Sequence, residues 1–284
     1  MMEDILPQIA SRYKTLTPRQ RKVAEYLFHN LNQAILLNSR QLAAKAGVSE
    51  ATLIRFITGL GFAGFPEFKK TVGQKILEDS STSKRLAESA RTMKGRMSMV
   101  KSILNGDVEN IQAMNAHMTE DVFENAVKKI CVARRLYVLG LRSSYSLAFY
   151  LAFNLRFFLT SVTLIELGIG DIPEQLRDMG SADVLVAISF KRYTKEVVRI
   201  TEKAKIKGTY VLAVTNSELS PIAQLADGVL IAKTSIPSYF ESFVAPMSLL
   251  NTLITAVAVK KKEKAVSALD RLEREFERFE TFVQ

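Results

Sequence analysis

Apolar side chains recur at helical spacing through the first 80 residues of the chain. Positions three or four apart fall on one face of a helix, so each such series predicts an amphipathic helix packed on a core. Thr17, Pro18 and Gln20 also have the form of a capping box that begins a helix. We therefore predict a small all-helical unit. Its two clearest apolar series are Ile5, Ile9 and Tyr13, then Val23, Leu27 and Leu31.

The pattern changes after about residue 130, where short apolar runs alternate with helical segments. Such runs indicate strands that are buried on both faces, and their alternation with helices is typical of a parallel sheet. The predicted fold class is an all-α domain followed by an α/β domain whose parallel sheet is flanked by helices. The predicted strands are residues 136–139, 162–165, 184–188, 210–214 and 229–231.

Residues 39–58 predict a helix-turn-helix within the helical unit. Ala43 and Ala46 are small enough for two helices to cross closely, and Gly47 can adopt the positive φ that ends the first helix. Ser49 is a suitable N-cap for the second helix. An ordinary helical hairpin is the alternative, but small, Gly, cap and apolar positions all occur in the required order. The expected shared core is Leu42, Val48, Leu53 and Phe56.

Several side chains of this motif are candidates for contact with double-stranded DNA. In a helix-turn-helix the second helix enters the major groove and the first crosses the phosphate backbone. The apolar spacing of the second helix leaves Ala51, Thr52 and Arg55 pointing outward. We expect Arg55 to contact a base edge or phosphate. We place Ser49, Ala51 and Thr52 near the groove floor, Ser39 and Arg40 on the backbone, and Lys69 and Lys70 as further phosphate candidates.

Charge and length agree with this interpretation. The chain has 284 residues and a formal net charge of +10, and basic proteins gain DNA affinity by releasing counterions from phosphates. We expect a helix-turn-helix domain at residues 1–79, a linker at 80–104 and a second domain at 105–284. The linker follows a polar, turn-forming segment and is basic, so it either contacts phosphates or forms a solvated helix. Its basic residues are Lys84, Arg85, Arg91, Lys94, Arg96 and Lys101.

Cysteine content and the chain start indicate the cytoplasm. Cys131 is the single cysteine, so no internal disulfide forms, and the opening residues lack the basic and apolar regions of a signal peptide. The apolar segment 244–259 resembles a membrane span followed by lysines. It is shorter than about 20 residues and contains Pro246 and Asn251, so we predict a buried helix and no membrane partner.

Two loops after predicted strands carry hydroxyl and basic side chains. Ligands of parallel sheets bind beyond the carboxyl ends of the strands, where helix N-termini favour anions. The Ser and Thr residues alternatively serve only as helix caps. We predict that the two loops bind a phosphate or carboxylate. The candidate ligand-binding residues are Gly140, Arg142, Ser143 and Ser144 after the first strand, and Ser189, Lys191, Arg192 and Thr194 after the third.

Nearly the whole chain resembles the RpiR family of bacterial transcriptional regulators. The resemblance rests on V-S-E-A-T-L-I-R-F at 48–56, L-G-F-A-G-F-P-E-F-K at 60–69, and the strand, loop and helix pattern at 209–227. Members of that family join an N-terminal helix-turn-helix domain to a C-terminal sugar isomerase (SIS) domain. The resemblance implies a regulator that senses phosphosugars and controls sugar catabolism genes.

The chain departs from the loops that SIS domains use for phosphosugars. Those loops usually have G-x-G-x-S and S-x-S-G-x-T patterns. Here Arg142 replaces the second glycine of the first loop, and Lys191 and Arg192 replace the Ser-Gly of the other, while Ser144, Ser189 and Thr194 match. Three cations in place of small residues either bind a smaller or more acidic ligand or fill the pocket.

Three functions therefore compete. The first is a ligand-responsive regulator, the second a DNA-binding protein with a vestigial pocket, and the third a SIS isomerase with a helical appendage. Isomerisation requires a base and often a histidine, but His29 and His117 precede the strands and Glu241, expected at the start of a helix at 240–259, is the one plausible base. We predict the first function, with no catalytic residue, no metal site and no cofactor.

The last predicted helix has an apolar seam that needs a partner. Its other faces are charged, so the seam packs either on its own domain or across a two-fold axis. A lone helix-turn-helix contacts few bases, which separately favours a homodimer or a dimer of dimers held by the SIS domains. We expect ligand binding to alter the spacing of the DNA-binding domains through the linker. The seam residues are Ala265, Leu269, Leu272, Phe276, Phe279 and Val283.

Overall fold

The chain divides into two compact units, Met1–Thr92 and Met93–Gln284. The computed structural model describes residues 5, 9, 12–35, 37–79, 82–93, 95–168, 172–218 and 220–283. The division falls within the predicted linker at 80–104, and the described residues on both sides of it are mainly helical. Lys94, one of the basic residues expected there, lies outside the described residues.

The first unit is helical, as the apolar spacing predicts. Thr17 and Gln20 form the predicted capping box, because the Thr17 amide donates to Gln20 Oε1 at 3.1 Å and the Gln20 amide donates to Thr17 Oγ1 at 3.3 Å. Ile5, Ile9, Val23 and Leu27 are all buried in one core. The elements are η1 (Tyr13–Thr15), α2 (Pro18–Ala34), α3 (Ser39–Lys45), α4 (Glu50–Gly59), α5 (Phe65–Asp79) and α6 (Thr82–Thr92).

The second unit contains the predicted parallel sheet, in the order β2-β1-β3-β4-β5. All five strands occur where the apolar runs predict them, three of them longer by one residue. The elements are α7 (Arg96–His117), α8 (Glu120–Val132), β1 (Leu136–Gly140), η2 (Arg142–Ser144), α9 (Tyr145–Arg156), β2 (Val162–Ile165), α10 (Ile172–Leu176), β3 (Val184–Ile188), α11 (Lys195–Ile206), β4 (Tyr210–Thr215), η3 (Ala223–Leu225), β5 (Gly228–Ile231), α12 (Val244–Lys260) and α13 (Lys262–Arg278).

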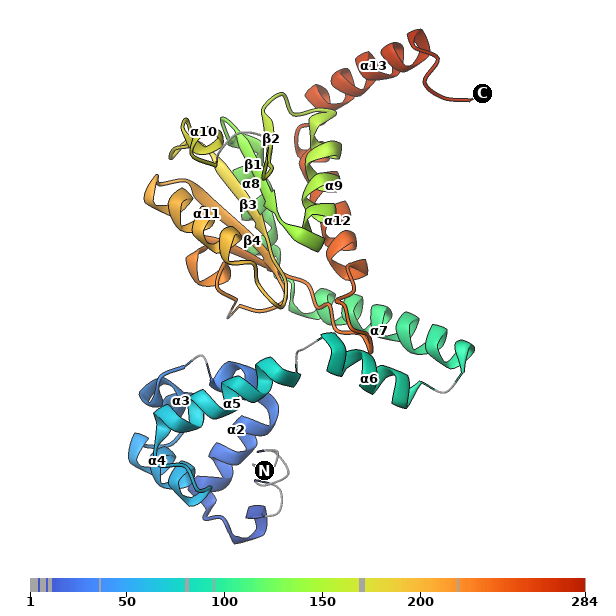
Figure 1. The fold of residues 1–284 in the computed structure, drawn as a ribbon. Coiled ribbons are helices and arrows are strands. Elements are labelled where there is room, and N and C mark those ends of the chain that lie inside the picture. The colour runs from blue at the N-terminus through green and yellow to red at the C-terminus, as the bar shows by residue number, and fades with distance from the viewer. Residues whose placement is uncertain are drawn as a thin grey trace. The chain divides into compact units, whose positions relative to one another are not determined.

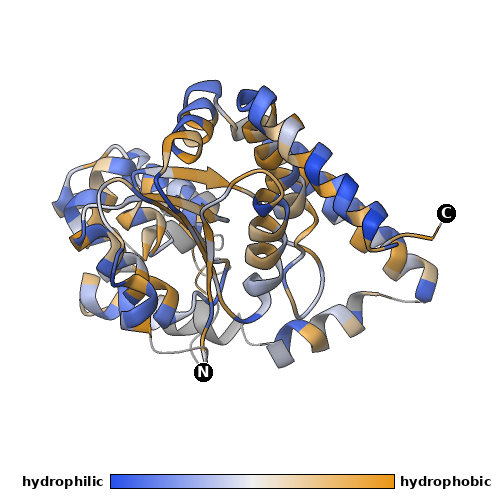
Figure 2. Ribbon diagram, turned by 90° about the horizontal axis from the view of Figure 1, so that it is seen from above, coloured by the Kyte–Doolittle hydropathy of each residue, from blue (hydrophilic) through white to orange (hydrophobic). Residues whose placement is uncertain are grey.

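Helices cover both faces of this sheet (Figure 1). Successive strand residues point to opposite faces, so Val184 and Val186 pack with α8, α9 and α12, whereas Leu185 and Ala187 pack with α10 and α11. Hydrophobic residues dominate the strands and polar residues dominate the helix that leads to the C-terminus (Figure 2). The predicted fold class is therefore confirmed.

The helix expected at 240–259 begins later than predicted. Helix α12 begins at Val244, and Glu241 lies in the loop before it. Ser242 explains this start, because its hydroxyl accepts a hydrogen bond from the Val244 amide at 3.3 Å and also bonds to Asp107. Among the described residues, no helix is both long enough and apolar enough to cross a membrane.

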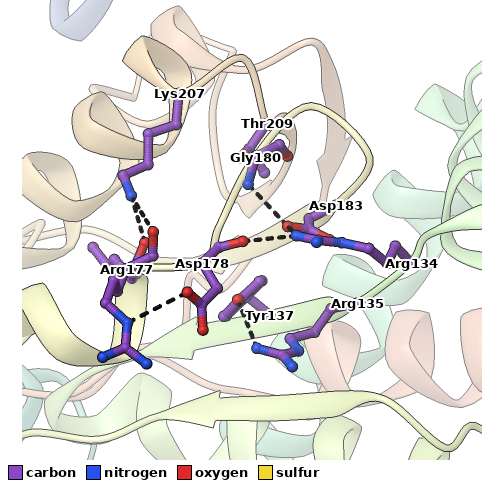
Figure 3. Close-up of polar contacts among 10 residues, drawn as sticks. Arg134, Arg135, Tyr137, Arg177, Asp178, Gly180, Asp183, Lys207 and Thr209 are labelled. Atoms are coloured by element: carbon purple, nitrogen blue, oxygen red, sulfur yellow. Dashed lines mark hydrogen bonds and ion pairs between the residues drawn. The ribbon is translucent and has the colours of Figure 1, made fainter.

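A polar network closes the amino ends of the central strands (Figure 3). Asp183, which precedes β3 and is 1% exposed, accepts hydrogen bonds from Arg134 Nε at 2.9 Å and from the Gly180 amide at 2.9 Å. Arg134 also donates to the Asp178 carbonyl at 2.7 Å, and Lys207 Nζ donates to the Leu176 carbonyl at 2.7 Å. Because these groups satisfy one another, the network fixes this end of the sheet.

Candidate DNA-binding surface and effector site

The first helix of the helix-turn-helix is fixed at both ends. Asn38 caps α3 by accepting a hydrogen bond from the Gln41 amide at 2.8 Å, and Gln41 Oε1 accepts one from the Asn38 amide at 3.0 Å. Gly47 has φ = 66°, the left-handed conformation expected of the residue that ends this helix. Ala43 and Ala46 are buried between the helices, as their small size predicts.

The second helix, α4, begins at the predicted cap. The Thr52 amide donates to Ser49 Oγ at 3.3 Å, and the two hydroxyls lie 2.9 Å apart. Thr52 is only 6% exposed, so the prediction that its side chain points outward is wrong. The reason is that the Thr52 hydroxyl and amide both turn toward the cap residue Ser49, at the start of the helix. Thr52 therefore positions α4.

The other predicted contact residues remain on the surface of the unit. Ser49, Ala51 and Arg55 on and before α4 are exposed, and so is Arg40 on α3. The Arg55 side chain lies along its own helix, where Nε donates to the Ala51 carbonyl at 3.2 Å. A guanidinium held this way keeps its remaining N–H groups for a partner outside the chain.

Two charged residues, Glu50 and Lys69, make contacts at the edge of this surface. Ser39 is half-buried and its hydroxyl bonds to Glu50, which connects the start of α3 to the start of α4. Lys69 on α5 donates from Nζ to the Leu37 carbonyl at 3.1 Å, so it fixes the segment before α3, whereas Lys70 is exposed. The sequence contained no signal for the Ser39 and Glu50 contact, because it joins two helices through their tertiary packing.

In the second unit, the sheet brings the two candidate ligand loops together. Gly140, the last residue of β1, pairs with Ile188, the last residue of β3. The chain leaves β1 toward β2 on one side, whereas β3 continues toward β4 on the other, so the loops after β1 and β3 adjoin the crevice where parallel sheets bind ligands. The residues after Gly140 and after Ile188 are therefore neighbours.

Gly140 is required by a close backbone approach. A Cβ atom at this position would lie 2.5 Å from the Ser144 carbonyl oxygen and 2.9 Å from Ala148 Cβ. Glycine thus lets η2 and the start of α9 pack directly against the end of β1. This places the Ser143 and Ser144 backbone at the carboxyl edge of the sheet.

Arg142 and Arg192 have a backbone conformation that glycine adopts more readily than other residues. Their φ angles are 56° and 68°, in the left-handed region that ordinary residues rarely adopt. Both side chains are exposed, as is that of Lys191. Within the described part of the chain these three cations make no hydrogen bond or ion pair. Strained positions of this kind cluster at binding sites, and here they present positive charge at the crevice.

The hydroxyl residues of the loops do not act as helix caps. Ser144 precedes α9 and Thr194 precedes α11, yet neither side chain accepts a hydrogen bond from its helix. Ser189 is buried directly after β3, where its amide donates to the Val214 carbonyl at 3.1 Å. Ser144 and Thr194 therefore do not cap these helices with their side chains.

Tyr193 and Asn216, which the sequence did not mark as site residues, and Glu241, its candidate base, are further polar residues of this region. The Tyr193 hydroxyl donates a hydrogen bond to Oδ1 of Asn216 at 3.0 Å. Asn216 lies in the loop after β4. Burial raises the pKa of Tyr193 above its ordinary value, so its hydroxyl is a neutral donor at pH 7. Glu241 accepts a hydrogen bond from Thr234 at 2.7 Å. Asn216 follows a predicted strand, the same signal that identified the other two loops.

Comparisons with known proteins agree with this architecture. The helix-turn-helix domain of the rpiR family matches residues 3–79, and the SIS domain matches residues 129–256. The HTH-type transcriptional regulator HexR of Pseudomonas aeruginosa is 27% identical over 269 residues, which cover 92% of this chain and 91% of HexR.

Two solved structures are similar as well. The sugar isomerase domain of an RpiR transcription factor from Sphaerobacter thermophilus is 27% identical with a TM-score of 0.58, over 61% of this chain and 96% of that domain. The Vibrio vulnificus NanR protein, complexed with ManNAc-6P, has a TM-score of 0.61 and 18% identity, over 97% of this chain and 99% of NanR. At that identity the NanR similarity shows the fold.

Proposed function

Because this chain belongs to the RpiR family of transcriptional regulators, which pair a helix-turn-helix with a SIS domain, we propose that it regulates genes in response to an anionic carbohydrate metabolite. The effector is a phosphosugar or a sugar acid. DNA binding belongs to residues 1–79, ligand sensing and self-association to residues 105–284, and residues 80–104 transmit the signal.

One observation carries the choice of an anionic effector. Arg142 and Arg192 occupy left-handed positions at adjacent strand ends and have no partner in the described part of the chain. A cation kept without an ion pair at a crevice is available to a phosphate or carboxylate, and a guanidinium binds either one with two parallel hydrogen bonds. The uncapped start of α11 adds amide donors and the positive end of a helix dipole.

The solved relatives support the same ligand class. The NanR protein is complexed with ManNAc-6P, a phosphorylated sugar, and shares this fold. The isomerase alternative has less support, because Glu241, the base that the sequence suggested, is engaged by Thr234 and lies outside the helix expected to carry it. The main alternative is a pocket that no longer binds a ligand, because the large side chains of Arg142, Lys191 and Arg192 could fill it.

Thermal stability measured with a ligand panel tests the proposal. A ligand that binds only the native state stabilises it by RT ln(1 + [L]/Kd), about 2.7 kcal/mol at 100 times Kd. We expect at least one of the sugar phosphates and sugar acids to raise the melting temperature. Absence of any shift, together with absence of heat in calorimetry, would establish the vestigial pocket instead.

A pair of matched variants locates the site. Arg192→Ala removes a cation of the loop after β3, whereas Arg199→Ala removes an exposed arginine of α11 that is paired with Glu196 at 3.0 Å. We expect Arg192→Ala to abolish the ligand-induced shift and Arg199→Ala to retain it. Both variants should bind operator DNA normally in the absence of ligand. An unchanged ligand response in Arg192→Ala would exclude this loop from the site.

A further inference from the structure

Helix α13 presents an apolar seam that its own unit leaves open. Ala265, at its start, is buried, but Leu269 is 36% exposed and Phe279 is 74% exposed. Leu272 and Phe276 are half-buried, and Phe276 is covered in part by the ring of Phe282, 5.0 Å away. These positions follow the alternating spacing of four and three that forms the contact line of a coiled coil. The seam therefore has the form of an interface without its partner.

The charges of α13 are divided between its two ends. Four lysines and Glu263 surround its start at 260–264, whereas five carboxylates and three arginines occupy 270–280. A helix dipole favours the opposite arrangement, with acidic residues first and basic residues last. A second helix running in the opposite direction would place an acidic end beside each basic end, so the distribution is complementary to itself.

A groove beside the seam provides space for a partner. It has a volume of about 800 Å³ and lies between α13 and the amino end of the sheet. Ile130, Leu159 and Leu272 are among the apolar residues that line it. Beyond α13, Phe282 and Val283 are both exposed. Charged side chains, among them Arg134, Lys264 and Glu275, also line the groove. The exposed tail of one chain can therefore contact both the apolar and the charged walls of the groove on the other chain of a symmetric pair.

We propose that α13 packs antiparallel against α13 of a second copy of this chain. In this pairing Leu269 lies opposite the partner's Leu272, and Ala265 opposite the partner's Phe276, so that a small residue meets a large one. The C-terminal tail of each chain then reaches the groove of the other. The proposal rests on the self-association stated under the proposed function, and names the surface that produces it.

Molar mass in solution tests the interface. The full chain has a mass of 31.8 kDa, and light scattering at micromolar concentration should give twice that value or a multiple of it. The double variant Leu272→Gln/Phe276→Gln should halve the mass. The matched control Arg274→Gln/Arg278→Gln changes the outer face of the same helix and should leave the mass unchanged.

Two outcomes would overturn the proposal. One is a monomeric wild-type chain, which would mean that another part of the same chain covers the seam. The other is a seam variant that keeps the wild-type mass while circular dichroism shows it to be folded, because the oligomer would then use a different surface. Ligand-induced stabilisation is measured on the same variants, so that loss of the interface and failure of the effector site give different results.

Spin labels test the antiparallel direction without disturbing the seam. Lys264, Arg271 and Arg278 share one heptad position, so their labels differ only in distance from the two-fold axis. In a Cys131→Ser background each position is replaced by Cys and labelled. In an antiparallel pair, every residue away from the two-fold axis adds about 3 Å to the separation of the two labels along the helix axis, because each helix contributes about 1.5 Å. The labels at 264 and at 278 are then offset along that axis by about 20 Å and those at 271 by almost nothing, so we expect clearly longer distances at 264 and 278 than at 271. Equal distances at all three positions would mean parallel helices.

Discussion

Two arginines in left-handed conformation distinguish this chain at the residue scale. Arg142 and Arg192 have positive φ angles, which glycine adopts more readily, and each carries a cation. A residue with a Cβ atom is less stable in this conformation than glycine is. Strained backbone of this kind clusters at binding sites, which agrees with the effector site that we propose at this crevice.

Arg192→Gly should therefore stabilise the fold while weakening the ligand response. We expect the free energy of unfolding to rise by about 0.5–1 kcal/mol in urea titrations, because the left-handed backbone is relaxed. Arg192→Ala is the control, since it removes the same side chain but keeps a Cβ atom. Equal stability of the Gly and Ala variants would contradict the strain.

In the helix-turn-helix unit, Arg55 is the arginine whose substitution we expect to have the largest effect on DNA binding. Its side chain is exposed on α4, with donors left over after the bond to Ala51. We expect Arg55→Ala to lower operator affinity by about 1–3 kcal/mol if the guanidinium contacts a guanine edge. Arg55→Lys should recover part of a phosphate contact and little of a base contact, because Lys lacks the planar fork. Unchanged affinity in a folded Arg55→Ala variant would remove this residue from the interface.

At the scale of elements, the two ends of the sheet differ in their backbone conformation and in their polar contacts. The carboxyl ends carry the strained loops, whereas the amino ends are held by the network of Asp183 (Figure 3). Burial raises the pKa of Asp183, but hydrogen bonds and charge from Arg134, with the amides of Gly180 and Arg135, lower it by more. The carboxylate is therefore ionised throughout the neutral range and stabilises the folded state.

This network predicts how stability depends on pH. A carboxyl whose pKa is lower in the folded state stabilises fully above its unfolded pKa, about 3.9, and the contribution is lost as pH falls through the folded pKa. Asp183→Asn should cost about 1–3 kcal/mol at pH 7 and flatten the loss of stability below pH 4. Asp178→Asn, at an exposed carboxylate of the same network, is the control. Urea titrations between pH 2.5 and 7 measure the free energy of unfolding of the two variants. If that free energy falls below pH 4 in Asp183→Asn as it does in the wild type, Asp183 is not the source of the acid-dependent loss of stability.

At the scale of the whole molecule, the helix-turn-helix and the seam of α13 belong to different units of the chain. Self-association through the second unit would pair two DNA-binding units without using their own surfaces. Paired recognition helices reach successive major grooves only when their half-sites are about one helical turn, or a multiple of it, apart.

Operator spacing should therefore govern affinity. Insertion of 5 base pairs between the half-sites turns one of them to the opposite side of the duplex, so we expect affinity to fall at least 10-fold, and insertion of 10 base pairs should restore most of it. Fluorescence anisotropy measures both at one salt concentration, because DNA affinity depends strongly on salt. The monomeric seam variant should be indifferent to spacing. A wild-type chain that is equally indifferent would show that it binds each half-site independently.

The sequence by itself determined the elements and their order. Strands β2 and β3 lie at the predicted residues, and the caps at Thr17, Gly47 and Ser49 lie where the helices begin or end as predicted. These features depend on residues close together in the chain: runs of apolar side chains, a hydroxyl before a helix, and a glycine after one. Local interactions of this kind are visible in a sequence because they repeat with a fixed period.

Only the tertiary structure decided which side chains are inside and which loops meet. The period of α4 left Thr52 outside, but its cap bond to Ser49 and its place beside the core bury it. Likewise, the pairing of Gly140 with Ile188 joins loops almost 50 residues apart, and Tyr193 meets Asn216 only because β3 adjoins β4. The open seam of α13 is a further case, since its period showed that it needs a partner and only the fold showed that its own unit leaves it uncovered. The physical reason is common to all of them: contacts between distant segments depend on strand order and packing, which have no period along the chain.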